Sequence, residues 1–383
     1  MSHPMCLSVL LCATPALAQT LRTVGPGLMH PDIVAALAAA APGDVVHVTA
    51  GTYAAFTLDK GVTLRAEPFG ASVVVAGPAS LAACIVELPA GQTAAIEGLE
   101  LRTQVLVRPP TGAAAAGAVA FTGTDVTLGM TVQDANAVLR DCVVDGFGAA
   151  LELLGTASVS AVQCQFRGAP ASWLPNPCGI RAGGSSSLHV GNSFVRGGTN
   201  GFHGVTAAAN GVQATGAARA WFVDTDVAAW NQSTLPCAAV SNQSSSPIAF
   251  ERGSALDNLG APGSFVGAVQ DSLVLGVSTN DQIEIGQLFT LDFRTRPGLP
   301  VFVHATFFLQ APVSYPIVVQ PDWGFAANSI FLAGMVADGQ GQAAYGIVIP
   351  PLPFLQDLQL WFSAWSAIDL PVQLAPVLGG TVR

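Results

Sequence analysis

Asp141-Cys-Val-Val-Asp-Gly146 starts a six-residue pattern that returns as Gln163-Cys-Gln-Phe-Arg-Gly168 and Asn192-Ser-Phe-Val-Arg-Gly197. Shorter versions occur at Gly98-Leu-Glu-Leu101, Asp224-Thr-Asp-Val227 and Gly253-Ser-Ala-Leu256. The first residues of these segments, which we call leads, are separated by 43, 22, 29, 32 and 29 residues, and 43 is close to twice 22. A period in the twenties with variable insertions is typical of stacked coils that carry loops on one side.

The lead position favours residues that tolerate a positive φ. Gly, Asn and Asp do so at the lowest cost, and five of the six leads are of these types, whereas Gln163 departs from the pattern. We therefore predict that the leads form equivalent bends stacked along one edge of the coils. The residues one and three places after each lead are small or apolar, which predicts two inward columns with a water-facing residue between them. The inward pairs are Leu99 and Leu101, Cys142 and Val144, Cys164 and Phe166, Ser193 and Val195, Thr225 and Val227, and Ser254 and Leu256.

The segment before the repeat predicts a helix followed by short strands. Asp32 is a suitable N-cap for a helix over 33–41, which Pro42-Gly43 would end. Alternating strands follow within 43–53 and 62–66. This order of a helix, Pro-Gly-Asp-Val-Val-His-Val and Ala-Gly-Thr-Tyr resembles the opening of secreted right-handed parallel β-helix proteins of the pectin-lyase-like kind. The resemblance implies that the helix caps the open end of the stack, and it implies little about activity.

From about residue 271 the alternating segments become longer, at 287–293, 301–309 and 358–364. Strands of this kind without lead residues predict an antiparallel β-sandwich. The predicted fold is therefore all-β, with a β-helix over 19–270 and a C-terminal sandwich over 271–383. This C-terminal module loosely resembles the small β-rich modules of exported bacterial repeat proteins, which implies attachment or packing.

The composition and the first residues predict an exported chain. Leu7 to Ala13 is apolar, and the small-residue site Ala16-Leu17-Ala18 follows it, as in a signal peptide over 1–18. Only 10% of the residues are charged, and the net charge of −10 argues against a nucleic-acid partner. The longest apolar runs are too short for a transmembrane span. We therefore expect a secreted or cell-surface location.

Cleavage after Ala18 would leave five cysteines, which cannot form a complete disulfide framework. Cys142 and Cys164 each follow a lead by one residue, so we expect them to stack inside adjacent coils as buried small residues. Cys178 and Cys237 lie in two segments of similar composition, each of which contains Trp and Pro. They are the candidates for a single disulfide. No Cys-x-x-Cys pair or histidine pairing supports a metal site.

The candidate site residues follow from the repeat register. Residues four places after the leads would lie in one outward row, which comprises Asp145, Arg167, Arg196, Ala228 and Asp257, and Asp226 would share their face. Arginine binds carboxylates bidentately, so the row could hold an acidic glycan. The alternative is a solvated ladder of ion pairs, each worth less than about 1 kcal/mol. Trp173 and Trp230 lie in loops and could stack on sugar rings.

The sequence does not establish an enzyme. It has no Gly-x-Ser-x-Gly elbow or Walker loop, and no three acids are placed on neighbouring coils as a calcium cage would need. We expect an exported scaffold that binds extracellular or cell-surface carbohydrate without turnover and without a cofactor. One alternative is a divergent polysaccharide lyase or glycoside hydrolase, and only the lyase would need Ca²⁺. The other is a structural surface-layer or adhesion protein.

Overall fold

The structure is a computed structural model that describes residues 19–77, 83–168, 177–198, 210–229, 238–250, 256–258, 265–271, 275–279, 282–307, 309, 312, 320, 323, 329–352, 355–366 and 372–383. The predicted signal peptide, Trp173, Trp230, Cys237 and Gly253 lie outside these residues. No described helix has the length and apolar character needed to span a bilayer.

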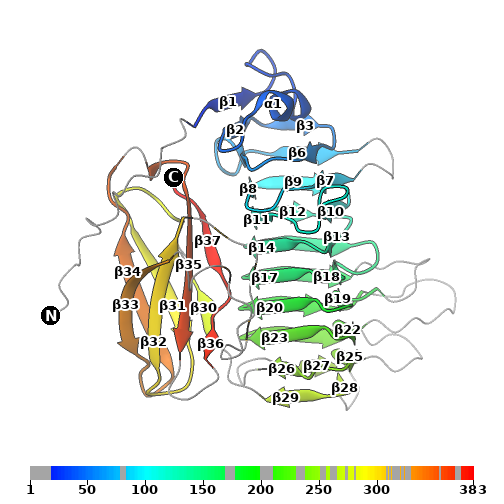
Figure 1. Cartoon of the computed structure of the whole chain (residues 1–383), viewed down its shortest axis with the longest axis vertical. Coiled ribbons are helices and arrows are strands. Elements are labelled where there is room, and N and C mark those ends of the chain that lie inside the picture. Colours follow the sequence, from blue (N-terminus) through cyan, green and yellow to red (C-terminus); the bar gives the residue numbers. More distant parts are fainter. Residues whose placement is uncertain are drawn as a thin grey trace, which may run out of the picture.

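Three parallel sheets, stacked coil upon coil, form the larger part of the molecule (Figure 1). Successive coils contribute one strand to each sheet, and the strands pair in register with those of the next coil. Sheet A contains β1 (Leu21–Val24), β2 (Val45–Val48), β5 (Thr63–Ala66), β8 (Thr93–Glu97), β11 (Ala118–Thr122), β14 (Asn136–Arg140), β17 (Ser158–Val162), β20 (Ser187–Gly191), β23 (Arg219–Val223), β26 (Ile248–Phe250) and β29 (Val269–Asp271).

The other two sheets contain nine strands each. Sheet B contains β3 (Gly51–Tyr53), β6 (Val73–Ala76), β9 (Leu99–Arg102), β12 (Asp125–Val126), β15 (Val143–Gly146), β18 (Gln165–Gly168), β21 (Phe194–Arg196), β24 (Asp226–Ala229) and β27 (Leu256–Asn258). Sheet C contains β4 (Thr57–Leu58), β7 (Cys84–Val86), β10 (Val105–Val107), β13 (Met130–Gln133), β16 (Leu151–Leu154), β19 (Ile180–Ala182), β22 (Val212–Gly216), β25 (Val240–Ser244) and β28 (Phe265–Val266).

The leads that the structure describes occupy equivalent bends between sheet A and sheet B, as the repeat predicted. Their φ angles are 69° at Gly98, 52° at Asp141, 57° at Gln163, 44° at Asn192 and 46° at Asp224. Gly123, with φ 55°, is a further lead that divides the interval of 43 residues into two coils of 25 and 18. The assumption of two nearly equal coils was therefore wrong, because the short β12 shortens the second coil.

Gln163 is the lead whose residue type does not favour a positive φ. Its side-chain amide contacts the C-terminal module, since Nε2 donates to the carbonyl oxygen of Thr279 at 2.6 Å and Oε1 accepts from the Thr279 amide at 3.4 Å. These two hydrogen bonds offset part of the cost of the left-handed conformation.

We predict that Asn192→Val lowers the free energy of unfolding by about 1–2 kcal/mol, because a β-branched residue is strained at φ 44°. Asn192→Gly is the matched control, because glycine adopts a positive φ without strain. It is expected to lower the free energy of unfolding by only a few tenths of a kcal/mol. Urea unfolding of both variants measures the difference. Equal stability of the two variants would contradict the left-handed assignment.

The described inward columns are buried, so the predicted interior of the coils is confirmed. Cys142 and Cys164 lie on adjacent coils, and the Gln165 amide donates to the Cys142 carbonyl oxygen at 2.8 Å. Both thiols are buried, and burial raises the pKa of Cys164 well above its usual range. Cys178 is also buried. Its pairing with Cys237 stays a prediction.

One helix, α1 (Ile33–Ala39), lies at the N-terminal end of the stack beside β1 and β2 (Figure 1). The Asp32 carboxylate accepts a hydrogen bond from the Ala35 amide at 2.7 Å. The helix ends two residues before the predicted end at residue 41, because Ala40 is extended. Ile33, Ala36 and Leu37 are the buried side chains of this helix.

The C-terminal module consists of two antiparallel sheets with a shared apolar core. One sheet contains β30 (Gly276–Ser278), β31 (Leu288–Arg294) and β34 (Gln342–Val348), and the other contains β33 (Ile330–Val336), β32 (Pro300–Thr306), β35 (Gln359–Ser366), β36 (Gln373–Leu374) and β37 (Leu378–Thr381). The boundary predicted after residue 270 falls within β29, the last parallel strand.

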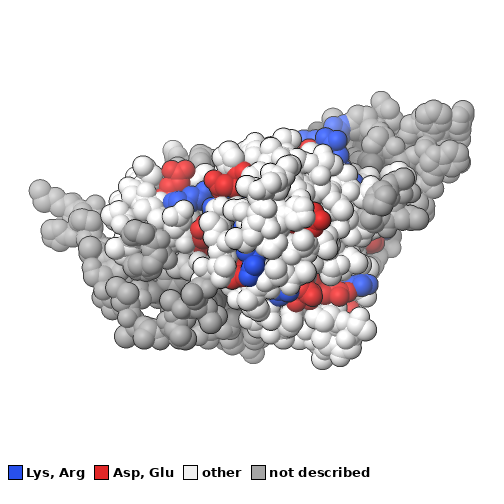
Figure 2. Space-filling view, turned by 90° about the horizontal axis from the view of Figure 1, so that it is seen from above, with Lys and Arg blue, Asp and Glu red and all other residues white. Residues whose placement is uncertain are grey.

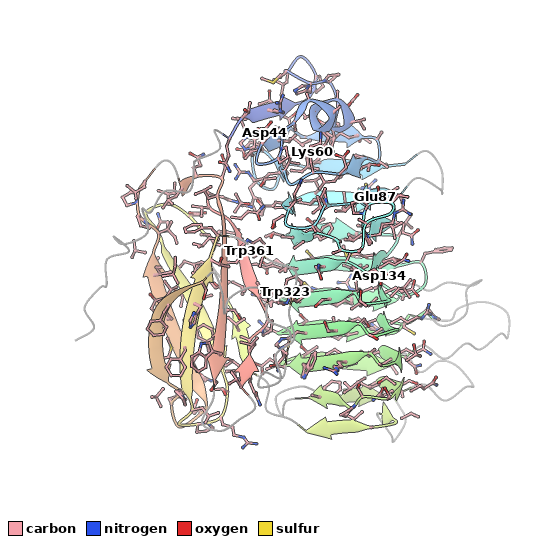
Figure 3. All side chains as sticks on the ribbon, viewed as in Figure 1. Asp44, Lys60, Glu87, Asp134, Trp323 and Trp361 are labelled. Atoms are coloured by element: carbon pink, nitrogen blue, oxygen red, sulfur yellow. The ribbon has the colours of Figure 1, made fainter. Side chains whose placement is uncertain are left out.

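The C-terminal module lies against the outer face of sheet A (Figure 1). Small and apolar residues of sheet A, including Ala95, Ala120 and Val138, form a buried cluster with Trp323 and Trp361. Figure 3 shows the two tryptophans where the module faces the β-helix. Sheet A is therefore buried on both faces, and sheets B and C carry the outward residues of interest.

Candidate functional site

The structure aligns the predicted row on the outer face of sheet B. Strand register places Asp145 opposite Arg167, Arg167 opposite Arg196, and Arg196 opposite Ala228, with the Asp257 backbone on the next coil. Ala228 is buried, so the charged part of the row ends at Arg196. Asp226 is exposed and occupies the neighbouring column of the same sheet, opposite Phe194.

The ion pair between Asp145 and Arg167 is long and exposed to solvent. Arg167 Nη1 lies 3.8 Å from Asp145 Oδ1, and the two side chains are 46% and 42% exposed. A pair this exposed contributes less than about 1 kcal/mol to stability. Arg167 also contacts the side-chain oxygen of Gln165.

Arg167 and Arg196 are neighbouring cations. Burial lowers the pKa of the Arg196 guanidinium, and the positive charge of Arg167 lowers it further. Adjacent strands are about 4.8 Å apart, so the two like charges repel one another unless an anion lies between them. The arrangement can therefore hold a carboxylate or another anion.

Three further charged residues of sheet B escaped the sequence interpretation, namely Glu100, Arg102 and Asp125. Arg102 Nε donates to Glu100 Oε1 at 2.6 Å, and the register places Asp125 opposite Glu100. Burial raises the pKa of Asp125, and the negative charges of Glu100 and Asp145 raise it further. The signal was present, because Gly123-Thr-Asp-Val126 shares its last three residue types with Asp224-Thr-Asp-Val227.

The coil of Gly123, which the repeat analysis missed, adds an acid to this face. Glu100, Asp125 and Asp145 lie on three consecutive coils of sheet B. Within the described part of the chain, however, no group of three or more His, Cys, Asp or Glu residues is arranged to hold a metal ion.

A hollow of about 540 Å³ lies where the chain passes from sheet B to sheet C. Leu128 and Phe147 line it with side chains that are 40% and 53% exposed. On sheet C, Glu152 and Arg181 occupy adjacent coils and form an ion pair with an O–N distance of 3.0 Å. Polar groups beside an exposed aromatic ring match a sugar, which has apolar C–H faces and polar edges.

Gly146 shapes this corner. A Cβ atom at Gly146 would lie 2.2 Å from the carbonyl oxygen of Ala149, so the turn that presents Phe147 requires glycine. The segments that contain Trp173 and Trp230 come next in the chain after β18 and β24 of the same sheet, but both residues lie outside the described part.

Charged side chains elsewhere are sparse and mixed in sign. On the face seen in Figure 2, basic and acidic residues lie next to one another on a largely uncharged surface. Arg108 and Glu87, for example, form an ion pair at 2.6 Å on adjacent coils of the β-helix. On sheet B, the Asp145–Arg167 pair follows the same pattern, and Arg196 adds a second positive charge next to Arg167.

Comparisons of the chain with protein-family models, with curated proteins and with solved structures found no match.

Proposed function

We propose that this chain is an exported right-handed parallel β-helix that binds an acidic extracellular polysaccharide without turnover. In this proposal α1 caps the N-terminal end of the stack, and the C-terminal module is a β-sandwich. Crossovers between parallel strands are almost always right-handed, which supports the handedness. The signal-like segment before Ala18 supports export.

The observation that carries the proposal is the pair of neighbouring arginines on sheet B. A uronate carboxylate would neutralise the repulsion between Arg167 and Arg196 through charge-assisted hydrogen bonds. A polymer that continues around the corner would reach the hollow of Leu128 and Phe147, where a sugar ring can stack. Asp145 and Asp226 flank the arginines and accept hydrogen bonds from hydroxyl groups.

We predict that the double variant Arg167→Ala, Arg196→Ala loses at least about tenfold in affinity for polygalacturonate, because two charge-assisted hydrogen bonds are removed. Retention on immobilised polygalacturonate and titration calorimetry measure the loss. Arg102→Ala removes an arginine from the same sheet face and is the matched control, with unchanged affinity expected. Equal affinity of the double variant and the control would exclude the row as the binding site.

A divergent polysaccharide lyase or hydrolase is the second candidate, and Asp125 is the observation that favours it. Its raised pKa keeps a larger protonated fraction at mildly acidic pH than an ordinary aspartate has, as a general acid requires. Release of unsaturated or reducing sugars from polygalacturonate by the wild-type chain, and its loss in Asp125→Asn, would replace the non-catalytic proposal with this one.

A further inference from the structure

A polar cleft of about 470 Å³ lies where the β-helix meets the C-terminal module. The leads Asn192 and Asp224 line it from the β-helix. Ser278 of β30, Asp292 and Arg294 of β31, and Gln342 of β34 line it from the module. Figure 1 shows β30 on the side of the module that faces the β-helix, and β31 pairs with it. The cleft is separate from the row on sheet B.

The walls of the cleft are fixed by backbone conformation and by one ion pair. Asn192 and Asp224 occupy adjacent coils with φ angles of 44° and 46°. Their backbone positions are therefore fixed by the bends between the two sheets. Arg294 forms an ion pair with the Asp224 carboxylate and thereby connects the module to the β-helix. Ligand sites are frequent at junctions of this kind, and the volume lies within their usual range.

The charges of the cleft are unequal. Three carboxylates, those of Asp224, Asp292 and Asp338, face one guanidinium, that of Arg294, which gives a formal charge of −2. Arg294 neutralises Asp224, and the Asp338 carboxylate accepts from the backbone amides of Gln340 and Gln342 at 2.8 and 2.9 Å. The Asp292 carboxylate has no hydrogen bond or ion pair with any other described residue. It is therefore the acceptor that remains for a ligand.

The uncharged groups of the cleft suit hydroxyl groups. The Asn192 and Gln342 amides each offer donors and an acceptor, and the Ser278 hydroxyl can do either. A sugar hydroxyl also donates and accepts. A ligand that carries both hydroxyl groups and one positive charge would therefore match the cleft.

We propose that this cleft binds an amino sugar, with its ammonium group on Asp292 and its hydroxyl groups on the amides of Asn192 and Gln342. The site goes beyond the proposed function, because its charge preference is opposite to that of Arg167 and Arg196. The ligand would contact both parts of the molecule and would hold them together.

The experiment titrates the full chain with the hexamer of β-1,4-linked glucosamine by calorimetry. Asp292→Asn keeps the shape of the side chain and is expected to weaken binding about tenfold, since a charge-assisted hydrogen bond is lost. Asp59→Asn is the matched control, because Asp59 is 65% exposed beside Lys60 at the other end of the molecule, and its affinity is expected to equal that of the wild type. The N-acetylated hexamer, which lacks the positive charge, is expected to bind about tenfold more weakly.

Results of three kinds would overturn the proposal. The first is equal affinity of Asp292→Asn and Asp59→Asn, or no binding of the glucosamine hexamer. The second is equally tight binding of the acetylated hexamer, which would remove the role of the ammonium group. The third is equally tight binding of hexalysine, which would assign the cleft to basic peptides.

The test is independent of the sheet B site. The double variant Arg167→Ala, Arg196→Ala is expected to bind the glucosamine hexamer with unchanged affinity, and Asp292→Asn is expected to keep its retention on polygalacturonate. If the wild type does not bind polygalacturonate, the proposed function is wrong. The titration with the glucosamine hexamer would still test the cleft.

Discussion

The Glu97→Ala variant is expected to unfold with a free energy about 3–5 kcal/mol below that of the wild type, because it breaks a buried ionic contact from one side. Glu97 is 1% exposed on the outer face of sheet A. Its Oε1 atom accepts from the Thr381 amide at 3.1 Å, and its Oε2 atom lies 3.7 Å from Arg383 Nη2. Without the carboxylate, the half-buried Arg383 and the Thr381 amide would lose their acceptor inside the interface.

Urea unfolding followed by tryptophan fluorescence measures this loss. Glu87→Ala is the control, because Glu87 pairs with Arg108 at 2.6 Å on a more exposed surface, and its removal is expected to cost less than about 1 kcal/mol. Glu97→Gln separates charge from shape, since the amide can still accept from Thr381. If Glu97→Ala and Glu87→Ala are equally stable, the interface does not depend on the buried carboxylate.

The coil repeat could be predicted because its signal is local. A left-handed bend restricts the residue at one position, and the two inward positions that follow must be small or apolar, whatever the rest of the chain does. Asp141, Asn192 and Asp224 carry that signal, and Gly123 carries it too, but the short strand after it disguised the coil. Gln163 violates the rule because its side chain contacts Thr279 in the other module, which no local pattern shows.

The contact between the two modules could not be predicted, because it depends on the register of distant strands. The outward residues of sheet A are small in several coils, for example Ala95, Ala120 and Ser160, and in retrospect this marks a face that is covered. The Ser160 hydroxyl accepts from the Val377 amide at 2.9 Å, across 217 positions of sequence. Alternation alone identifies an outward residue without telling whether water or protein covers it.

The candidate site could be predicted only where its residues follow from the local repeat. Arg167 and Arg196 follow from counting after the leads, whereas the hollow depends on a turn over 147–149 and on Glu152 meeting Arg181 from the next coil. The spacing of those two residues includes an insertion between β18 and β19, which hides their alignment. The cleft at Asp292 needs both modules and has no sequence signature.

Trp361→Ala is expected to cost about 3–5 kcal/mol, as usual for a large buried aromatic side chain, and to weaken the contact between the modules first. Trp361 is 1% exposed and lies in a cluster with Ala95, Ala118, Ala120 and Val138 of sheet A. Its Nε1 atom has no hydrogen-bond partner within the described residues, so the loss is one of packing and cavity formation.

Phe166→Ala is the matched variant, because Phe166 is fully buried inside the coils and belongs to the separate core of the β-helix. This variant is expected to lose a similar free energy of unfolding. The two variants should differ in what unfolds. Trp361→Ala should give an early transition in urea in which the C-terminal module becomes sensitive to protease while the parallel coils persist, because β35 is lost from the face of sheet A. Phe166→Ala should lower the transition of the coils themselves. A single transition for Trp361→Ala at the wild-type midpoint would show that the tryptophan does not hold the modules together, and the small residues of sheet A would then need another explanation.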